Sequence, residues 1–221
     1  MTNLAPIFND IANCQLANVN WVIPDGRWSD HAGKGILGNL GLGPAYVASI
    51  INAIGSDKKC DNGGCWNDTV ILVTWDDWGG WFDHVPPFKV VNDGTSWGSG
   101  YAYGFRVPLL VVSGWTPQGY VDGALPGGRT PATTHDFGSI LSFVEQNFGL
   151  SFVTGIGRYA DFFAPDNPHP LAGFFGNTTF QQFHQIPLSG MYSGFSASYF
   201  QTYTDGGGPA DPDLDAAEDL D

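Results

Sequence analysis

The segment TVILVTWDDWGGWFDHVPPF, residues 69–88, brings carboxylate and imidazole side chains directly after an apolar run. These side chains belong to Asp76, Asp77, Asp83 and His84. Two adjacent carboxylates repel each other unless a cation or a proton lies between them. Carboxylate oxygens suit Mg²⁺, Ca²⁺ or Mn²⁺, and a nearby histidine also admits Zn²⁺ or iron. The segment therefore indicates a divalent-metal site, and the alternative is an ordinary strand-ending turn of Asp and Gly residues.

A second segment, VNWVIPDGRWSDH, repeats this arrangement over residues 19–31. It ends in Asp25, Asp30 and His31 after a short branched and aromatic run. In open α/β sheets, ligands bind beyond the carboxyl ends of the strands. The recurrence of acids and a histidine at such ends therefore predicts a functional site at that edge of a sheet.

Three apolar segments are expected to form strands, over residues 19–24, 69–75 and 106–115. The second and third are nearly continuous apolar runs, which are typical of strands buried on both faces in a parallel sheet. Pro108 near the start of the third favours an edge or a first-residue position.

Residues 44–55 and 137–148 each show apolar residues at helical spacing. The apolar positions are Val47, Ile50, Ile51 and Ile54 in the first helix, and Phe137, Ile140, Leu141, Val144 and Phe148 in the second. Pro44 suits the start of the first helix, and Asp136 and Gly149 suit the two caps of the second. The order strand, helix, strand, strand, helix predicts an α/β fold with a mostly parallel sheet.

A length of 221 residues suits one sizeable core, and residues 1–204 are predicted to form one domain. From Ser151 onward the pattern gives way to Gly, Pro, Asn and aromatic residues, which predicts an irregular, loop-rich C-terminal third. Residues 205–221 hold seven of the 22 acidic residues and no basic residue, which predicts a disordered tail.

The formal net charge of −14 argues against nucleic acid as a partner, because phosphate backbones are bound by clustered Lys and Arg. No stretch reaches the roughly 18 apolar residues that a membrane-spanning helix needs. The opening sequence MTNLAPIFNDIANC lacks the basic start and the long apolar segment of a signal peptide, so we expect no export signal in this chain.

Cys60 and Cys65 flank the turn-forming sequence DNGG, and Cys14 is the third cysteine. The spacing favours a small disulfide-closed loop in an oxidising compartment, and two free thiols are the alternative. Zinc is less favoured, because no second Cys or His pair lies at ligand spacing.

Residues 69–88 resemble the signature of a bacterial phosphoesterase family that includes non-haemolytic phospholipases C and related acid phosphatases. The signature is a buried strand followed by T-x-D-[ED]-x-G-G-x-F-D-H-V-P-P. The segments VNWVIPDGRWSDHAG, YGFRVPLLVVSGWTPQGYV and SILSFVEQNFGL also resemble the family and stand in the same order. The resemblance runs from about Phe8 to Phe163 and corresponds to the C-terminal half of the family.

The resemblance implies part of the three-layer fold of the alkaline phosphatase and sulfatase superfamily. It also implies hydrolysis of a phosphate ester, such as a phospholipid, through a metal-activated nucleophile. By this resemblance Asp76 and Asp77 bind a divalent metal ion. His31 contacts the phosphoryl group or protonates the leaving oxygen, with Asp30 or Asp25 orienting it.

The remaining positions follow from the same resemblance. His84 contacts phosphate or supports the site, with Asp83 as its partner. Asp136 matches the aspartate of the family's D-H-T-S sequence, but Phe137 stands where that family has histidine. His135 is interpreted as a polar residue near a helix N-terminus. Proteins of the family are often secreted or periplasmic, which suits a Cys60–Cys65 disulfide.

The family's E-N-x-S-F-D segment and its Ser or Thr nucleophile have no match in this sequence. Ser29, Thr74 and Ser113 are interpreted as turn and strand residues, and His169 and His184 as structural. We therefore expect activity to require a complementary N-terminal half. The alternatives are a non-catalytic ligand-binding domain and an inactive fragment that retains the family fold.

Overall fold

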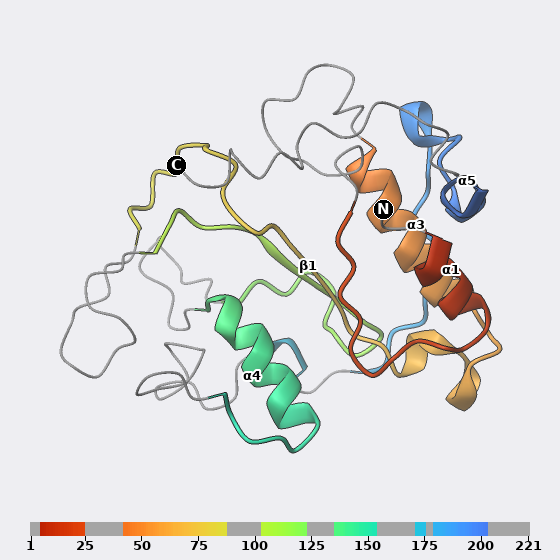
Figure 1. Ribbon diagram of the computed structural model, residues 1–221, viewed down its shortest axis with the longest axis horizontal. Coiled ribbons are helices and arrows are strands. Elements are labelled where there is room, and N and C mark those ends of the chain that lie inside the picture. Colours follow the sequence, from red (N-terminus) through yellow and green to blue (C-terminus); the bar gives the residue numbers. More distant parts are fainter. Residues whose placement is uncertain are drawn as a thin grey trace. The chain divides into compact units, whose positions relative to one another are not determined.

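Figure 1 shows the computed structural model of the chain, which describes residues 5–24, 42–87, 103–122, 135–153, 171–175 and 179–202. The chain divides into two compact units. Unit 1 comprises Met1–Ile71 and Gln182–Asp221, and unit 2 comprises Leu72–Gln181. The single domain over residues 1–204 remains a prediction, and the acidic tail at 205–221 lies outside the described residues.

Among the described residues of unit 1 are three helices, which lie together in Figure 1: α1 (Ala5–Ala12), α3 (Gly43–Ser56) and α5 (Ala197–Thr202). Its core contains three aromatic rings, Phe8, Tyr46 and Phe200, which are 1%, 2% and 0% exposed. Each ring contacts the other two, at centroid distances of 6.3, 6.2 and 5.2 Å. The three helices are therefore joined by one aromatic cluster.

Helix α3 confirms the predicted helix and also anchors the returning C-terminal segment of unit 1. Asn52 bonds the backbone of Ile186 twice: its Nδ2 donates to the carbonyl oxygen (2.9 Å), and its Oδ1 accepts from the amide (2.8 Å). One turn further on, a Cβ atom at Gly55 would overlap the ring of Phe183. That ring also packs edge-on against Trp66, with the centroids 5.1 Å apart. Gly55 is therefore a packing requirement of this helix.

The sheet has two strands, β1 (Ile71–Thr74) and β2 (Leu109–Val112). The strands run antiparallel, and the hydroxyl of Thr74 at the end of β1 donates to the carbonyl oxygen of Pro108 just before β2 (2.9 Å). The α/β class is confirmed, but the parallel pairing predicted for these strands is wrong. No residue of β1 is fully buried. The three-layer arrangement remains a prediction.

Residues 19–24 form no strand, contrary to the prediction from their branched and aromatic residues. Trp21 is 69% exposed and Ile23 is 78% exposed. A β-rich composition forms a strand only when a neighbouring strand pairs with it and covers its side chains. No strand among the described residues pairs with this segment.

Helix α4 (Phe137–Asn147) confirms the second predicted helix and its caps. Asp136 and Ser139 form a capping box at its start, and Gly149 adopts a left-handed φ of 64° after its end. The buried face is the one with small and polar residues, namely Gly138, Ser139, Ser142 and Glu145. The apolar stripe faces outward in part, and Phe137 is 50% exposed.

The described part of the C-terminal third contains irregular segments, as expected, and also short helices that the sequence analysis did not predict. These are η3 (Ala172–Phe175) in unit 2, and η4 (Gly190–Tyr192) and α5 in unit 1. Two further single-turn helices, η1 (Asp61–Gly63) and η2 (Cys65–Asn67), lie in unit 1 before β1. Within the described ranges, no helix has the length and apolar character needed to cross a bilayer.

Candidate functional site

The predicted acidic pair lies in an exposed turn one residue after β1. Asp76 and Asp77 are both exposed. Oδ1 of Asp77 accepts a hydrogen bond from the backbone amide of Gly79, which closes a short turn. Gly79 and Gly80 have φ values of 66° and 73°, in the left-handed region that glycine adopts without a steric cost. The sequence DDWGG therefore reverses the chain and leaves both carboxylates accessible.

Aromatic contacts position the loop that follows this turn. Trp78 and Phe82 each pack edge-on against the ring of Phe105, with centroid distances of 6.2 and 5.8 Å. Phe105 lies shortly before β2, so the contacts join the loop after one strand to the approach of the other. Trp78 and the signature phenylalanine, Phe82, thus make packing contacts in this structure.

Asp83 is held by Arg106 rather than chiefly by His84. Nε of Arg106 donates to Oδ2 at 2.7 Å and Nη2 donates to Oδ1 at 3.0 Å, a two-point ion pair. The amide of Val85 also donates to Oδ1 at 3.0 Å. Nδ1 of His84 lies 3.4 Å from the same oxygen, and the His84 side chain is 87% exposed. His84 is therefore open to a ligand, with a carboxylate behind it.

The contacts of Asp83 also determine its ionisation. Hydrogen bonding from Arg106, supported by the amide of Val85, lowers the pKa of Asp83 from 3.8 to about 2. Asp83 in turn raises the pKa of Arg106. The pair is thus ionised at neutral pH, and the Asp83 carboxylate accepts bonds from its neighbours without supplying a proton.

Asp136, which matches the aspartate of the family's D-H-T-S sequence, has a structural role in this chain. Its Oδ1 accepts from the amide of Ser139 at 3.1 Å, and its amide donates to the Ser139 hydroxyl at 3.1 Å. Its Oδ2 accepts from the hydroxyl of Tyr103 at 2.6 Å. This carboxylate therefore joins the start of α4 to the segment before β2.

His135 contacts an acid that sequence reasoning did not select. Its Nε2 lies 2.5 Å from Oδ2 of Asp122, and the two side chains are only 19% and 15% exposed. The hydroxyl of Tyr120 donates to the other oxygen of Asp122 at 2.8 Å. Nδ1 of His135 is buried without a hydrogen-bond partner among the described residues. The available signal was a Tyr-x-Asp sequence after the third apolar segment, which is too common to be informative.

The two carboxylates after β1 suit part of a metal site. Asp76 and Asp77 are accessible oxygen donors of the kind that hard divalent cations prefer. Within the described ranges, the one group of three or more metal-type ligands lies elsewhere, so a third ligand for this pair is not among those residues. Asp25, Asp30 and His31 lie outside the described residues.

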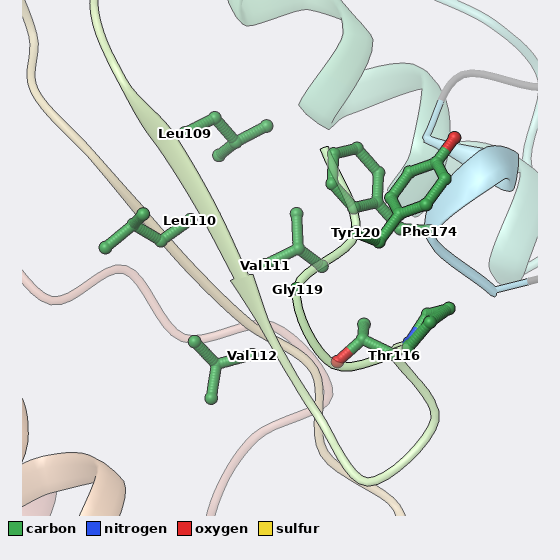
Figure 2. A pocket seen from close by; sticks show the side chains of 9 residues that line it. Leu109, Leu110, Val111, Val112, Thr116, Gly119, Tyr120 and Phe174 are labelled. Atoms are coloured by element: carbon green, nitrogen blue, oxygen red, sulfur yellow. The ribbon is translucent and has the colours of Figure 1, made fainter. Parts of the chain in front are cut away.

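A small pocket of about 260 Å³ lies beside β2 in unit 2. Figure 2 shows its lining, to which β2 contributes Leu109 through Val112, and later segments contribute Thr116, Tyr120 and Phe174. None of the candidate metal ligands or catalytic residues lines it. The lining offers both apolar and polar surface and contains no charged side chain.

The sequence was then compared with known proteins. The sequence model of the Phosphoesterase family matches residues 1–151. Because this match covers more than half of the 221 residues, the chain belongs to the Phosphoesterase family. The resemblance identified from the TWDDWGGWFDHVPP block is thereby confirmed.

The similar proteins are phospholipases C from bacteria and plants. A non-hemolytic phospholipase C from Burkholderia pseudomallei is 30% identical over 157 residues, which are 63% of this chain and 20% of the relative. Phospholipase C B from Mycobacterium tuberculosis is 31% identical over 160 residues, which are 64% of this chain and 27% of the relative. Non-specific phospholipase C1 from Arabidopsis thaliana is 34% identical over 120 residues, which are 51% of this chain and 21% of the relative.

The aligned part of the chain thus spans between 20% and 27% of the length of these curated relatives. No solved structure matches the chain.

Proposed function

We propose that the chain is part of a metal-dependent hydrolase of phosphate esters, of the phospholipase C or acid phosphatase kind. The observation that supports this most directly is the exposed pair Asp76 and Asp77 in the turn after β1. The pair stands within the family's signature block, and the chain belongs to the Phosphoesterase family. The proposal extends to the three-layer fold of the alkaline phosphatase superfamily for the whole protein.

In this proposal, Asp76 and Asp77 are two of the ligands of a divalent metal ion. When bound, such an ion offsets the negative charge of a phosphate ester and lowers the pKa of a nucleophile. The turn at Gly79 and Gly80 presents both carboxylates on one short segment, which suits shared binding of one cation. Further ligands come from outside the described residues.

In this proposal, one histidine contacts the phosphoryl group and another donates the proton to the leaving oxygen. His84 is exposed beside the acidic turn and can donate a hydrogen bond to a phosphate oxygen. Asp83 and Arg106 fix the backbone from which His84 projects. His31 protonates the leaving alkoxide, and Asp30 or Asp25 orients its ring. Asp136 supports the site through its bond to Tyr103.

In this proposal, no residue of this chain acts as the nucleophile. The proposal therefore includes a complementary segment that carries it, since the chain spans at most 27% of the length of the relatives compared above. The chain's own contribution is then metal and phosphate binding, which can be measured even where turnover is slow.

The test measures phosphate binding and hydrolysis in the presence of Mg²⁺, Mn²⁺, Ca²⁺ or Zn²⁺. Inorganic phosphate and phosphocholine are titrated by calorimetry with and without metal, and p-nitrophenyl phosphate and p-nitrophenyl phosphocholine report turnover. We expect metal-dependent phosphate binding by the wild type and its loss in the Asp76→Asn/Asp77→Asn double variant. Asp61→Asn, an exposed acid in unit 1, is the matched single-charge control.

Two results contradict the proposal. Phosphate binding or turnover that persists unchanged in the double variant excludes Asp76 and Asp77 as metal ligands. A folded wild-type chain that shows neither metal-dependent phosphate binding nor turnover contradicts the function itself.

A further inference from the structure

Four metal-type side chains converge in unit 1: Asp57, Cys60 and Cys65 from one short segment, and Cys14 from a segment distant in sequence. One candidate ligand atom of each, three Sγ atoms and a carboxylate oxygen, lies within 4.8 Å of all the others. Cys60 and Cys65 are joined in a disulfide with their Cα atoms 5.1 Å apart, and Cys14 is a free, exposed thiol. A thiol and a carboxylate thus lie directly beside a disulfide.

Backbone contacts fix the positions of two of these residues, Cys14 and Asp57. Cys14 follows the end of α1 with a left-handed φ of 54°, and its amide donates to the carbonyl oxygen of Ile11 at 3.2 Å. Asp57 caps α3, and its amide donates to the carbonyl oxygen of Ala53 at 3.2 Å. The convergence therefore follows from the packing of α1 against α3.

Lys59 connects the end of α1 to the end of α3 through two hydrogen bonds. Its Nζ donates to the carbonyl oxygen of Ala12 at 3.2 Å, and its amide donates to Oδ1 of Asp57 at 2.6 Å. Oδ2 of Asp57 has no hydrogen bond among the described residues and is available as a ligand. Cys65 is 6% exposed, and its carbonyl oxygen accepts from the hydroxyl of Thr69 at 2.6 Å.

We propose that reduction of the Cys60–Cys65 disulfide converts this cluster into a zinc site with Cys14, Asp57, Cys60 and Cys65 as ligands. A dithiol reductant transfers two electrons and two protons to the two sulfurs, and the reductant becomes a disulfide. Zn²⁺ then replaces the protons of the three thiols, which are released to solvent. The site shares no ligand with the phosphoesterase site and is independent of the proposed function.

The distances suit a tetrahedral site. With Zn–S bonds of about 2.3 Å, the sulfur atoms of such a site lie about 3.8 Å apart. All ligand atoms already lie within 4.8 Å of one another, so reduction requires only a small separation of the two bonded sulfurs. Three thiolates and one carboxylate belong to the donor types that bind Zn²⁺, whereas Mg²⁺ and Ca²⁺ prefer oxygen donors alone.

The local charges also suit this site. Zn²⁺ with three thiolates and one carboxylate has a net charge of −2. Lys58 and Lys59, two of only eight basic residues in the chain, lie between the ligands Asp57 and Cys60.

The first test uses cobalt as a spectroscopic probe of the full chain. The chain is reduced with a phosphine, freed of the reductant under inert gas and titrated with Co²⁺ and then Zn²⁺. We expect thiolate-to-cobalt charge-transfer bands that saturate at one Co²⁺ per chain, and displacement of these bands by Zn²⁺. The oxidised chain is expected to show no such bands. The Asp76→Asn/Asp77→Asn variant should behave as the wild type.

Single substitutions then assign the ligands. Cys14→Ser and Asp57→Asn should each weaken Co²⁺ binding about tenfold or more, because even residues that only support ligands change affinity by that amount. Asp61→Asn removes the same charge within the loop and should bind as the wild type. Circular dichroism of each oxidised variant checks that the fold is retained.

The second test needs no variant. Zinc should protect all three cysteines of the reduced wild type from iodoacetamide, as read by mass spectrometry. The proposal is contradicted if the reduced chain gives no thiolate–cobalt bands, if Cys14→Ser binds as tightly as the wild type, or if Cys14 is alkylated at saturating zinc.

Discussion

Asp83 binds Arg106 through both carboxylate oxygens, with Oδ2 2.7 Å from Nε and Oδ1 3.0 Å from Nη2. The pair joins the loop after β1 to the segment that leads into β2. It therefore connects the family's signature block to a residue that the signature does not contain. His84, which follows Asp83, takes its position from this ion pair.

The ion pair predicts a specific dependence on pH. The pKa of Asp83 is about 2 in the folded chain and 3.8 in the reference state, so its contribution to stability is complete above pH 3.8. Below that pH the unfolded state binds a proton first, and the contribution is lost as the pH falls toward 2. Urea unfolding of unit 2 between pH 5 and about 2 measures this loss.

Arg106→Gln should raise the pKa of Asp83 toward 3.8, because the main cause of its lowering is removed. The carboxyl carbon of Asp83 can be titrated by NMR to measure this. Lys58→Gln removes a positive charge from unit 1 and serves as the control. An Asp83 pKa that stays near 2 in Arg106→Gln would show that the ion pair does not form in solution.

The cap of α4 predicts different results for two substitutions of Asp136. Asp136→Ala should lower the free energy of unfolding by about 1 kcal/mol or more, because the Ser139 amide and the Tyr103 hydroxyl both lose an acceptor. Asp136→Asn retains a good N-cap oxygen and should be milder. Urea denaturation gives both values, and equal effects of the two changes would argue against the capping role.

Replacement of Gly55 by alanine should lower the stability of the chain, whereas the same change at an exposed helix position usually raises it. An exposed Gly→Ala change within a helix stabilises it by about 0.5–1 kcal/mol. At Gly55 the added methyl group overlaps the ring of Phe183, so Gly55→Ala should destabilise the chain by roughly 1–3 kcal/mol. Thermal unfolding measures the change.

Removal of the Phe183 ring tests the cause of that effect. In the Phe183→Ala background, Gly55→Ala should be close to neutral, since the overlapping ring is absent. Gly194→Ala, where a Cβ meets no atom within 4 Å, is the control and should leave the stability nearly unchanged. A stabilising Gly55→Ala in the wild type would contradict the packing in unit 1.

Tyr46 predicts a loss of stability at high pH. Burial raises the pKa of Tyr46 from 10.0 to about 12. Its contribution is complete below pH 10 and is lost as the pH rises toward 12, because the unfolded state releases the proton first. Unfolding of unit 1 should therefore become easier over this range. Tyr46→Phe should show less of this dependence, whereas Tyr192→Phe, which retains Tyr46, should show all of it.

Local signals in the sequence were sufficient for α3 and α4, whereas α1 and α5 were not predicted. Pro44 and the four apolar residues of α3 define one face of a helix, and the structure has that helix at Gly43–Ser56. Asp136 and Gly149 lie at the caps predicted for α4. Such signals depend on neighbours within about one turn, which a single sequence contains.

Contacts between distant segments were not predictable in the same way. The apolar runs located β1 and β2, but strand direction depends on which strands pair. The helical spacing of α4 identified an apolar stripe, yet the buried face contains Glu145. That carboxylate is satisfied by the amide of Val153, which donates to Oε1 at 2.6 Å. Periodicity shows that a helix has two faces and not which neighbour covers each one.

The same limit applies to the candidate sites. The acidic turn was recognisable because Asp76 and Asp77 are adjacent in sequence. Arg106 and Asp122 could be recognised only from the structure, in which Arg106 binds Asp83 and Asp122 contacts His135. Cys14 and Asp57 reach the Cys60–Cys65 loop because α1 packs on α3, and the sole signal in the sequence was that the third cysteine had no partner.

Unit 1 is discontinuous in the chain, and this has a consequence for biosynthesis. Phe8 and Tyr46 leave the ribosome early, whereas Phe200, the third ring of their cluster, is made after the whole of Leu72–Gln181. Domains generally fold as units during synthesis, so unit 2 can form while the first helices still wait for their last partner. The unit that is begun first is therefore completed last, and a nascent chain that stops before α5 leaves its aromatic cluster open.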